Sequence, residues 1–382
     1  MTSADDGIAL SRCYFEDLVA PLLKLHIPEM RYAAARVGPG SDVLGLDDPM
    51  SRDHDWGLRL QLFVPNADQA RVHSALDQHL PTHFRGHPIR FGFSADPTER
   101  LRIDVTSEGA FTEQQLGFDP RDAASVVDWL SLTGQAVLEV VSGAVFEDQT
   151  GELTALRDVL TWYPDDIWRY LVACDWQRLD QELPLMGRAG DRGDELGSRV
   201  IAARLVDIAV HLGFMLSRVW PPYSKWRGSA FGQLTECAAI AADLGRTLDA
   251  RHWDDRQRAL NDALNDLARL QQKSGLPAPQ PAVEPFWDRP YIHLNRSLVP
   301  ALLETLKNPE VQALPVGVGS VEQHTDNVDI LTNPRSPARA RNIGPRARVD
   351  TQANVLICRD RANRGSARGS SQVKTHQSVR LD

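Results

Sequence analysis

The sequence lacks the features that define several common protein classes. Only 4 of its 382 residues are cysteine, and these lie far apart without a Cys-x-x-Cys pair, so we expect neither a zinc site nor a disulfide framework. The chain has no run of about 18 apolar residues and no basic, apolar leader, so the sequence predicts no membrane span and no signal peptide. Together these absences favour a reducing, cytoplasmic setting.

Positive charge is also scarce over most of the chain. The net charge is −9, which argues against a surface that coats nucleic acid. Residues 333–382 are the exception, with 11 Lys and Arg residues against 3 Asp and Glu residues and few large apolar side chains. This composition predicts a disordered basic tail. A solvated tail without a role is one interpretation, and an arm that contacts RNA is the other.

The composition of the chain is that of a globular protein, with 42% hydrophobic residues. The spacing of the apolar residues changes near residue 119. Before that point short alternating segments favour strands, and after it apolar residues recur with helical spacing. We therefore predict an α/β domain over residues 1–118, with a short mixed or antiparallel sheet and flanking helices. An all-α helical-bundle domain would follow over residues 119–332.

The most informative segment is DHDWGLRLQLFV, residues 53–64. Its apolar and polar residues alternate almost without a break, which predicts a half-buried strand. Asp53 and Asp55 would then share the open face, with His54 on the packed side. Two like charges aimed at one point repel unless a cation lies between them.

A third carboxylate follows in the predicted hairpin. Residues 89–94 and 101–106 both alternate, and a short polar turn separates them. Asp104 is the one acidic residue on the polar face of the second segment. We expect it to join the other two aspartates.

These residue types suit phosphoryl-group chemistry. Magnesium binds carboxylate oxygens together with the phosphates of a substrate, and two such ions can bridge the attacking and leaving oxygens. Asp53 and Asp55 would be ligands, and Asp104 would bind a second ion or accept the proton of an attacking hydroxyl. Gly40 and Ser41 fit as the phosphate-binding end, since glycine admits close approach of backbone N–H groups and serine adds a donor.

The order of these motifs resembles that of the DNA polymerase β-like nucleotidyltransferase superfamily. It consists of Gly-Ser, eleven further residues, Asp-x-Asp and an aspartate on a later strand. The layout is similar to that of aminoglycoside and lincosamide nucleotidyltransferases, small bacterial enzymes with a helical C-terminal domain. More narrowly, the segments YPDDIWRYLVACDWQRL, GDELGSRVIAARLV and YSKWRGSAF resemble an uncharacterised bacterial family of nucleotidyltransferase-like proteins. This resemblance covers about residues 10–332.

The resemblance implies a Mg²⁺-dependent enzyme that moves a nucleoside monophosphate, with AMP favoured, from ATP or another nucleoside triphosphate to a hydroxyl. It also implies that Lys225 contacts the triphosphate, against the alternative of an exposed loop cation. A small-molecule acceptor is favoured and a protein hydroxyl stays open. The acidic body makes a nucleic-acid acceptor unlikely.

Two other functions compete with this one. A catalytically inactive nucleotide-binding or antitoxin-like module would show a damaged carboxylate set. A helical ribonuclease would use Arg204 and His211, but we expect a solvated helix face there. Arg59 falls on the same strand face as the carboxylates, and the sequence leaves open whether it balances them or binds substrate.

Overall fold

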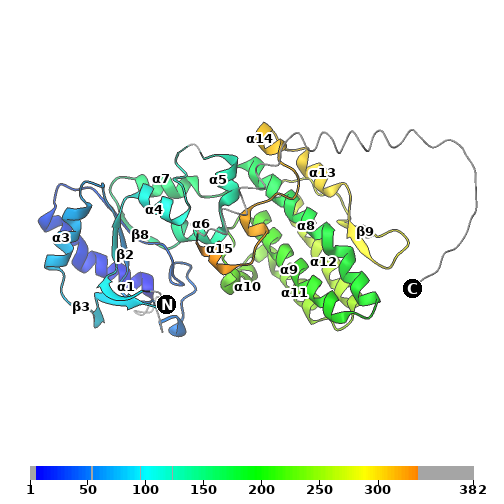
Figure 1. The fold of residues 1–382 in the computed structure, drawn as a ribbon, viewed down its shortest axis with the longest axis horizontal. Coiled ribbons are helices and arrows are strands. Elements are labelled where there is room, and N and C mark those ends of the chain that lie inside the picture. The colour runs from blue at the N-terminus through cyan, green and yellow to red at the C-terminus, as the bar shows by residue number, and fades with distance from the viewer. Residues whose placement is uncertain (1–5, 53–54, 95, 123, 334–382) are drawn as a thin grey trace, which may run out of the picture.

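The computed structural model describes residues 6–52, 55–94, 96–122 and 124–333. Figure 1 shows a small sheet with its helices at one end of the molecule and a bundle of long helices at the other. The predicted basic tail and the segment Asp53–His54 lie outside the described residues.

The chain opens with helical turns of two kinds. Helix α1 (Gly7–Tyr14) begins where the Asp6 side chain accepts the N–H of Ile8, and α2 (Ala20–His26) follows a π-helical stretch, η1 (Phe15–Val19). The sequence predicts one helix kinked at Pro21. The wider π-helical turn lies just before this proline because Pro21 has no N–H to donate back to the preceding turn.

A four-stranded mixed sheet forms the centre of the first part, in the order β7-β2-β1-β8. Strand β1 runs antiparallel to both β2 and β8, whereas β2 and β7 are parallel. The strands are β1 (Ala33–Arg36), β2 (Leu60–Phe63), β7 (Ile103–Thr106) and β8 (Ala144–Asp148). Every residue of β1 and β2 is buried, so both faces of the sheet are covered.

The two faces of this sheet belong to different apolar cores. Ala34 and Leu62 pack with α1, α2 and α3 (Gln69–His79), whereas Ala33 and Phe63 pack with the helices that follow the sheet. Strand β8 lies beyond residue 118, so the sheet takes an edge strand from the region for which the sequence predicts a helical domain. The division into domains therefore stays a prediction.

The predicted hairpin is wrong in its second strand. Two short hairpins, β3 (His83–Phe84) with β4 (His87–Pro88) and β5 (Arg90–Phe93) with β6 (Asp96–Leu101), precede β7. Residues 103–106 leave the hairpin and pair with β2 instead. The carbonyl of Arg102 accepts the N–H of Leu60 at 3.1 Å, while its side chain bonds back to the carbonyl of Phe91.

Shorter helices surround β8 and lead into the bundle. Ser107, Ser125 and Thr133 cap the first three with their side chains, as the preference for Ser and Thr at this position predicts. These helices are α4 (Glu108–Gln115), α5 (Val126–Ser131), α6 (Gly134–Val141) and α7 (Glu152–Val159).

The bundle lies in the part of the chain after residue 119, where apolar residues recur with helical spacing. Its long members are α8 (Asp165–Asp191), α9 (Glu195–Ser217), α11 (Ala238–Asp249) and α12 (Trp253–Lys273), and α10 (Ser224–Gly232) and η3 (Thr235–Cys237) lie between α9 and α11. Short elements complete the described chain: β9 (Val283–Pro285), β10 (Ile292–Leu294), α13 (Leu298–Leu303), α14 (Pro309–Gln312), η4 (Val321–Gln323) and α15 (Val328–Thr332).

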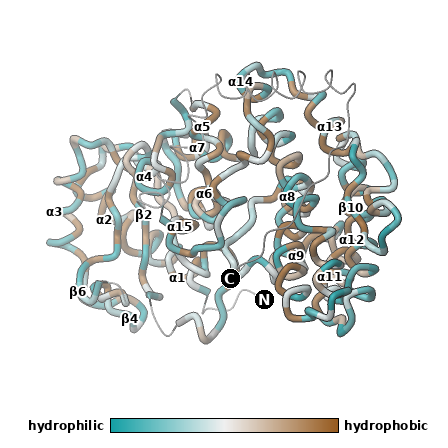
Figure 2. The backbone as a smooth tube through the Cα atoms, turned by 45° about the vertical axis from the view of Figure 1, so that its right-hand side comes forward, coloured by the Kyte–Doolittle hydropathy of each residue, from teal (hydrophilic) through white to brown (hydrophobic). Residues whose placement is uncertain are grey.

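Helix α9 is long and apolar enough to cross a membrane by composition alone, and it is the one such helix in the described residues. Most of its apolar stretch is buried inside the protein, and Figure 2 shows the hydrophobic stretches of α8 and α9 in the helical part of the molecule. A core helix of a soluble protein has this same character.

A buried ionic cluster joins the bundle to the shorter helices. His211 on α9 is 3% exposed, and its ring nitrogens lie 2.6 Å from Asp175 Oδ2 and 3.4 Å from Glu322 Oε1. The other oxygen of Glu322 accepts the N–H of Gly134, the first residue of α6. Burial alone would lower the pKa of His211, but the two carboxylates outweigh burial and raise it to about 9.

The side chains of Arg204 and His211 lie in different environments. Arg204 is exposed and pairs with Glu182, while His211 points into the core. The expectation of a solvated face is therefore wrong for His211, and the two residues do not share a surface on which a ribonuclease site would form.

We predict that His211→Gln lowers the free energy of unfolding by about 3–5 kcal/mol, because it leaves two buried carboxylates without a cation. Since the folded pKa exceeds the unfolded one, the contribution of His211 is complete below about pH 6.5 and disappears as the pH rises through about 9. Urea unfolding of parent and variant between pH 6 and 10 measures both effects. The matched control is His73→Gln on exposed α3, and equal stability of His211→Gln and the parent at pH 6 would contradict the prediction.

Candidate functional site

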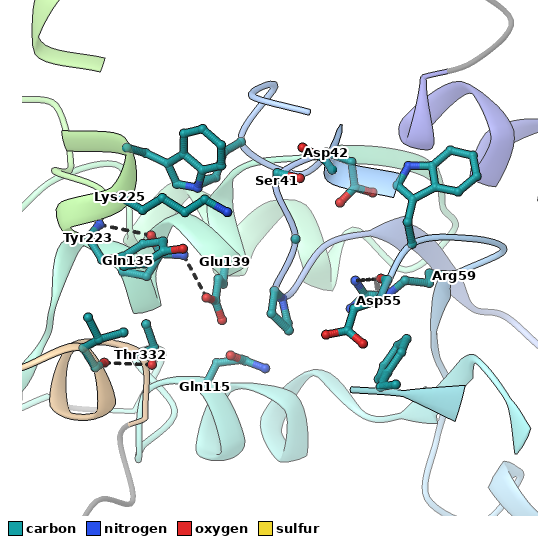
Figure 3. Close-up of a pocket in the computed structure, with 18 of the residues that line it drawn as sticks. Ser41, Asp42, Asp55, Arg59, Gln115, Gln135, Glu139, Tyr223, Lys225 and Thr332 are labelled. Atoms are coloured by element: carbon teal, nitrogen blue, oxygen red, sulfur yellow. Dashed lines mark hydrogen bonds between the residues drawn. The ribbon is translucent and has the colours of Figure 1, made fainter. Parts of the chain in front are cut away.

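A cavity of about 1040 Å³ lies between the sheet and the helices, large enough for a nucleotide-sized ligand. Its wall comes from the loop after β1, the segment before β2 and the helices α4, α6, α10 and α15. Figure 3 shows Ser41 and Lys225 on one side of the space, Asp55 and Arg59 on another, and Glu139 between them.

A buried ion pair shapes the loop after β1. The Arg36 guanidinium, 0% exposed, holds Asp42 through two N–H···O contacts of 2.7 Å. It also donates to the carbonyls of Val37 and Pro39, so one side chain fixes the whole turn. Two such parallel bonds give this pair defined geometry as well as charge neutralisation.

This ion pair gives Gly40 a role that the sequence did not suggest. Its φ is 151°, and a Cβ atom there would overlap Asp42 Oδ1 and Arg36 Nη2. Glycine is required because the ion pair occupies the space of a side chain. Both Gly40 and Ser41 line the cavity.

The predicted strand that carries the aspartates begins later than expected. Strand β2 starts at Leu60, because β1 ends at Arg36 and β7 begins at Ile103, opposite Leu60. Residues 55–59 therefore have no neighbouring strand, and the prediction that Asp53 and Asp55 share a strand face is wrong for Asp55. Asp53 lies outside the described residues.

Asp55 nevertheless lies on the cavity wall. Its backbone has a φ of 57°, in the left-handed region, and its Oδ1 accepts the N–H of Ser94 at 2.6 Å. Asp104 is exposed on β7, opposite Gln61, and its Oδ2 accepts from Gln61 Nε2 at 3.3 Å. Asp104 is not among the described residues that line the cavity.

Arg59 connects these acidic groups electrostatically. Burial and Arg36 lower its pKa to about 10, and the carboxylates of Asp42, Asp104 and Asp55 act in the opposite direction. Its guanidinium also lies 5.0 Å from the centre of the Phe93 ring. The sequence left Arg59 unassigned, and the structure makes it a buried cation within reach of three carboxylates.

Lys225 reaches the same cavity from the helical part. It is an exposed residue in the first turn of α10, not in a loop, and its ammonium lies 4.7 Å from the centre of the Trp226 ring. Both side chains line the cavity. The structure thus brings Gly40, Ser41, Asp55 and Lys225 to one space.

Sequence reasoning missed Glu139 on α6. This side chain is 6% exposed, lines the cavity and accepts from Gln135 Nε2 at 2.9 Å. Burial raises its pKa to about 7, and the Gln135 hydrogen bond, Arg59 and Arg36 only partly oppose this. The segment GQAVLEVV reads as an ordinary apolar helix, so no pattern marked the glutamate.

The described residues contain no group of three or more His, Cys, Asp and Glu side chains that could hold a metal ion. Asp53 lies outside that part, so the predicted three-carboxylate set stays a prediction. The chemistry of Asp55 and Asp104 suits magnesium, which takes carboxylate oxygens.

Residues 129–227 match a family model described as "Domain of unknown function (DUF4037)". The matched part contains Glu139 and Lys225. A search of curated proteins finds no match. Among solved structures, the chain is similar to a nucleotidyltransferase-like protein from Exiguobacterium sibiricum 255-15, with 13% identity, a TM-score of 0.31, and coverage of 70% of this chain and 76% of that chain. A likeness this distant carries no argument about the site, which is interpreted from its own geometry.

We predict that Asp42→Asn lowers the free energy of unfolding by about 3–5 kcal/mol, because it leaves the buried Arg36 guanidinium without a carboxylate partner. The double variant Arg36→Met/Asp42→Leu should be more stable than the single variant, since no unpaired charge remains. Chemical denaturation measures both, with exposed Asp288→Asn as the control. If Asp42→Asn matched the parent, the ion pair would not be what holds the loop.

Proposed function

We propose that this protein is a Mg²⁺-dependent nucleotidyltransferase that moves AMP from ATP to a hydroxyl of a small molecule. One observation carries the proposal: Gly40, Ser41 and Asp55 line the same cavity as Lys225, which is distant from them in the sequence. These are the residue types that a triphosphate and its metal require.

The phosphate end of the substrate would lie between Ser41 and Lys225. A serine hydroxyl is a neutral donor to phosphate oxygens, and a lysine ammonium is a compact charge suited to them. The two side chains lie on the same side of the cavity (Figure 3). Trp226 beside Lys225 offers an aromatic face for the nucleotide base.

Magnesium would be held by Asp55 with Asp53 and Asp104, and when bound it supplies Lewis-acid polarisation of the reacting phosphate. The protein's own contribution is to balance and orient these groups. Buried Arg59 attracts the carboxylates of Asp55 and Asp104, and the Ser94 N–H orients Asp55.

Arg59 also favours a second function, a non-catalytic nucleotide-binding or antitoxin-like module. A buried guanidinium among carboxylates is a resident cation, and it competes with a metal ion for the same negative charge. Such a module would bind nucleotide in the same cavity without needing Mg²⁺. The metal dependence of binding and turnover therefore separates the two functions.

We predict that Asp55→Asn abolishes Mg²⁺-dependent pyrophosphate release from ATP, because it removes a metal-binding carboxylate. Lys225→Ala should weaken ATP binding about tenfold, the effect of losing one hydrogen bond to a charged group. Calorimetric titration with Mg²⁺-ATP measures the affinity, and a coupled pyrophosphate assay with a panel of hydroxyl compounds measures the turnover.

The matched controls are Asp288→Asn and Lys273→Ala, which change exposed residues away from the cavity. ATP binding that is equally tight with and without Mg²⁺, in a protein that never releases pyrophosphate, would favour the binding module. Unchanged affinity in Lys225→Ala would remove that residue from the nucleotide site.

A further inference from the structure

The side of the cavity around Glu139 differs in chemistry from the proposed phosphate end. Among the described lining residues the only basic side chains are Arg59 and Lys225. The side around Glu139 carries five uncharged polar side chains, from α4, α6, α15 and the residue before α10: Gln114, Gln115, Gln135, Thr332 and Tyr223. Glu139 is the one carboxylate on these helices that lines the cavity.

Glu139 is held in a defined orientation. Gln135 Nε2 donates to its Oε1 at 2.9 Å, and the side-chain Oε1 of Gln135 accepts the N–H of Tyr223 at 3.3 Å. In the described part of the chain, Gln135 is the sole hydrogen-bond donor to this carboxylate. In Figure 3 the carboxylate points into the space between Lys225 and Gln115, so its second oxygen faces the cavity.

We propose that Glu139 is the base that takes the proton of the acceptor hydroxyl, and that the amide-rich wall around it binds a neutral or cationic polyhydroxyl compound without a phosphate group. This inference rests on the proposed nucleotidyl transfer and assigns its second substrate. A wall with hydrogen-bonding amides and one carboxylate attracts hydroxyl and ammonium groups. With Lys225 engaged by the triphosphate, this wall would leave an acceptor phosphate without a cation.

Geometry favours Glu139 over Asp104 as the proton acceptor, which is one of the two roles that the sequence predicts for Asp104. Asp104 is absent from the described cavity lining and accepts a hydrogen bond from Gln61. The charged and titratable groups that act on Glu139 are Arg59, Arg36 and Tyr223. Burial outweighs the two arginines and leaves the pKa of Glu139 at about 7, which suits proton transfer near neutral pH.

The step balances without further reagents. The acceptor O–H bond breaks and its proton goes to Glu139, while the oxygen forms a bond to the α-phosphorus of ATP. The bond from that phosphorus to the bridging oxygen breaks, and pyrophosphate leaves with the electron pair. Glu139 then returns the proton to solvent.

The test compares Glu139→Gln with the parent, with Glu113→Gln on exposed α4 as the matched control. The probes are Mg²⁺ with an α,β-methylene ATP analogue for binding, and Mg²⁺-ATP with glucose, glucosamine or glucose 6-phosphate for turnover. We expect Glu139→Gln to bind the analogue as the parent does but to release pyrophosphate at least 100-fold more slowly. In the parent the rate should rise with an apparent pKa near 7, and Glu139→Gln should lose this rise while Glu139→Asp keeps it at a lower rate.

The melting temperature of Glu139→Gln tests whether the variant is folded. Burial raises the pKa of Glu139 from 4.5 to about 7, so the parent loses stability as the pH rises from about 4.5, where the unfolded chain ionises, to about 7. The variant should therefore melt at a higher temperature than the parent at pH 8.5 and at nearly the same temperature at pH 4.

Each other outcome is decisive. A parent that does not bind the analogue overturns the proposed function itself. A parent that binds it but uses neither sugar, or prefers glucose 6-phosphate, overturns the acceptor class. A Glu139→Gln variant with the parent's rate and pH profile overturns the assignment of the base.

Discussion

A protonated imidazole between two buried carboxylates connects the main parts of this fold. His211 belongs to α9, Asp175 to α8 and Glu322 to η4, and Glu322 also holds the first N–H of α6. Helix α6 carries Gln135 and Glu139, so this ionic cluster fixes one wall of the cavity through the first residue of the helix. A charge buried this deeply is tolerated only while its partners stay in place, and α6 is therefore tied to the bundle.

Much of the fold could be predicted from periodicity, because most elements bury one face. The long helices α8, α9 and α12 lie where apolar spacing predicts helices. The prediction failed where an element depends on distant partners. The sequence of residues 53–58 alternates like a strand, but residues 55–58 have no neighbouring strand. Strand β7 pairs with β2 although its own sequence suits the nearer hairpin. Alternation describes which face is buried and does not specify the partner.

The site could be predicted only in part, for a related reason. Short motifs mark Gly40, Ser41, Asp55 and Lys225, and all four line the cavity. Nothing marks Glu139 in an apolar helix, and nothing marks the pairing of Arg36 with Asp42. Both depend on burial, which turns an ordinary carboxylate or guanidinium into a group with a shifted pKa or a fixed geometry. Burial is a property of the assembled structure.

The cavity wall runs from Pro39 to Asn333, almost the whole described chain. Its last element, α15, is held by a hydrogen bond from Thr133 to the carbonyl of Leu331. During synthesis the sheet and the Gly40–Ser41 loop emerge early, whereas this closing helix emerges nearly 300 residues later. A nascent chain would hence possess most of the polar residues of the cavity long before it possesses an enclosed space, so ligand capture would await the docking of the C-terminal helix.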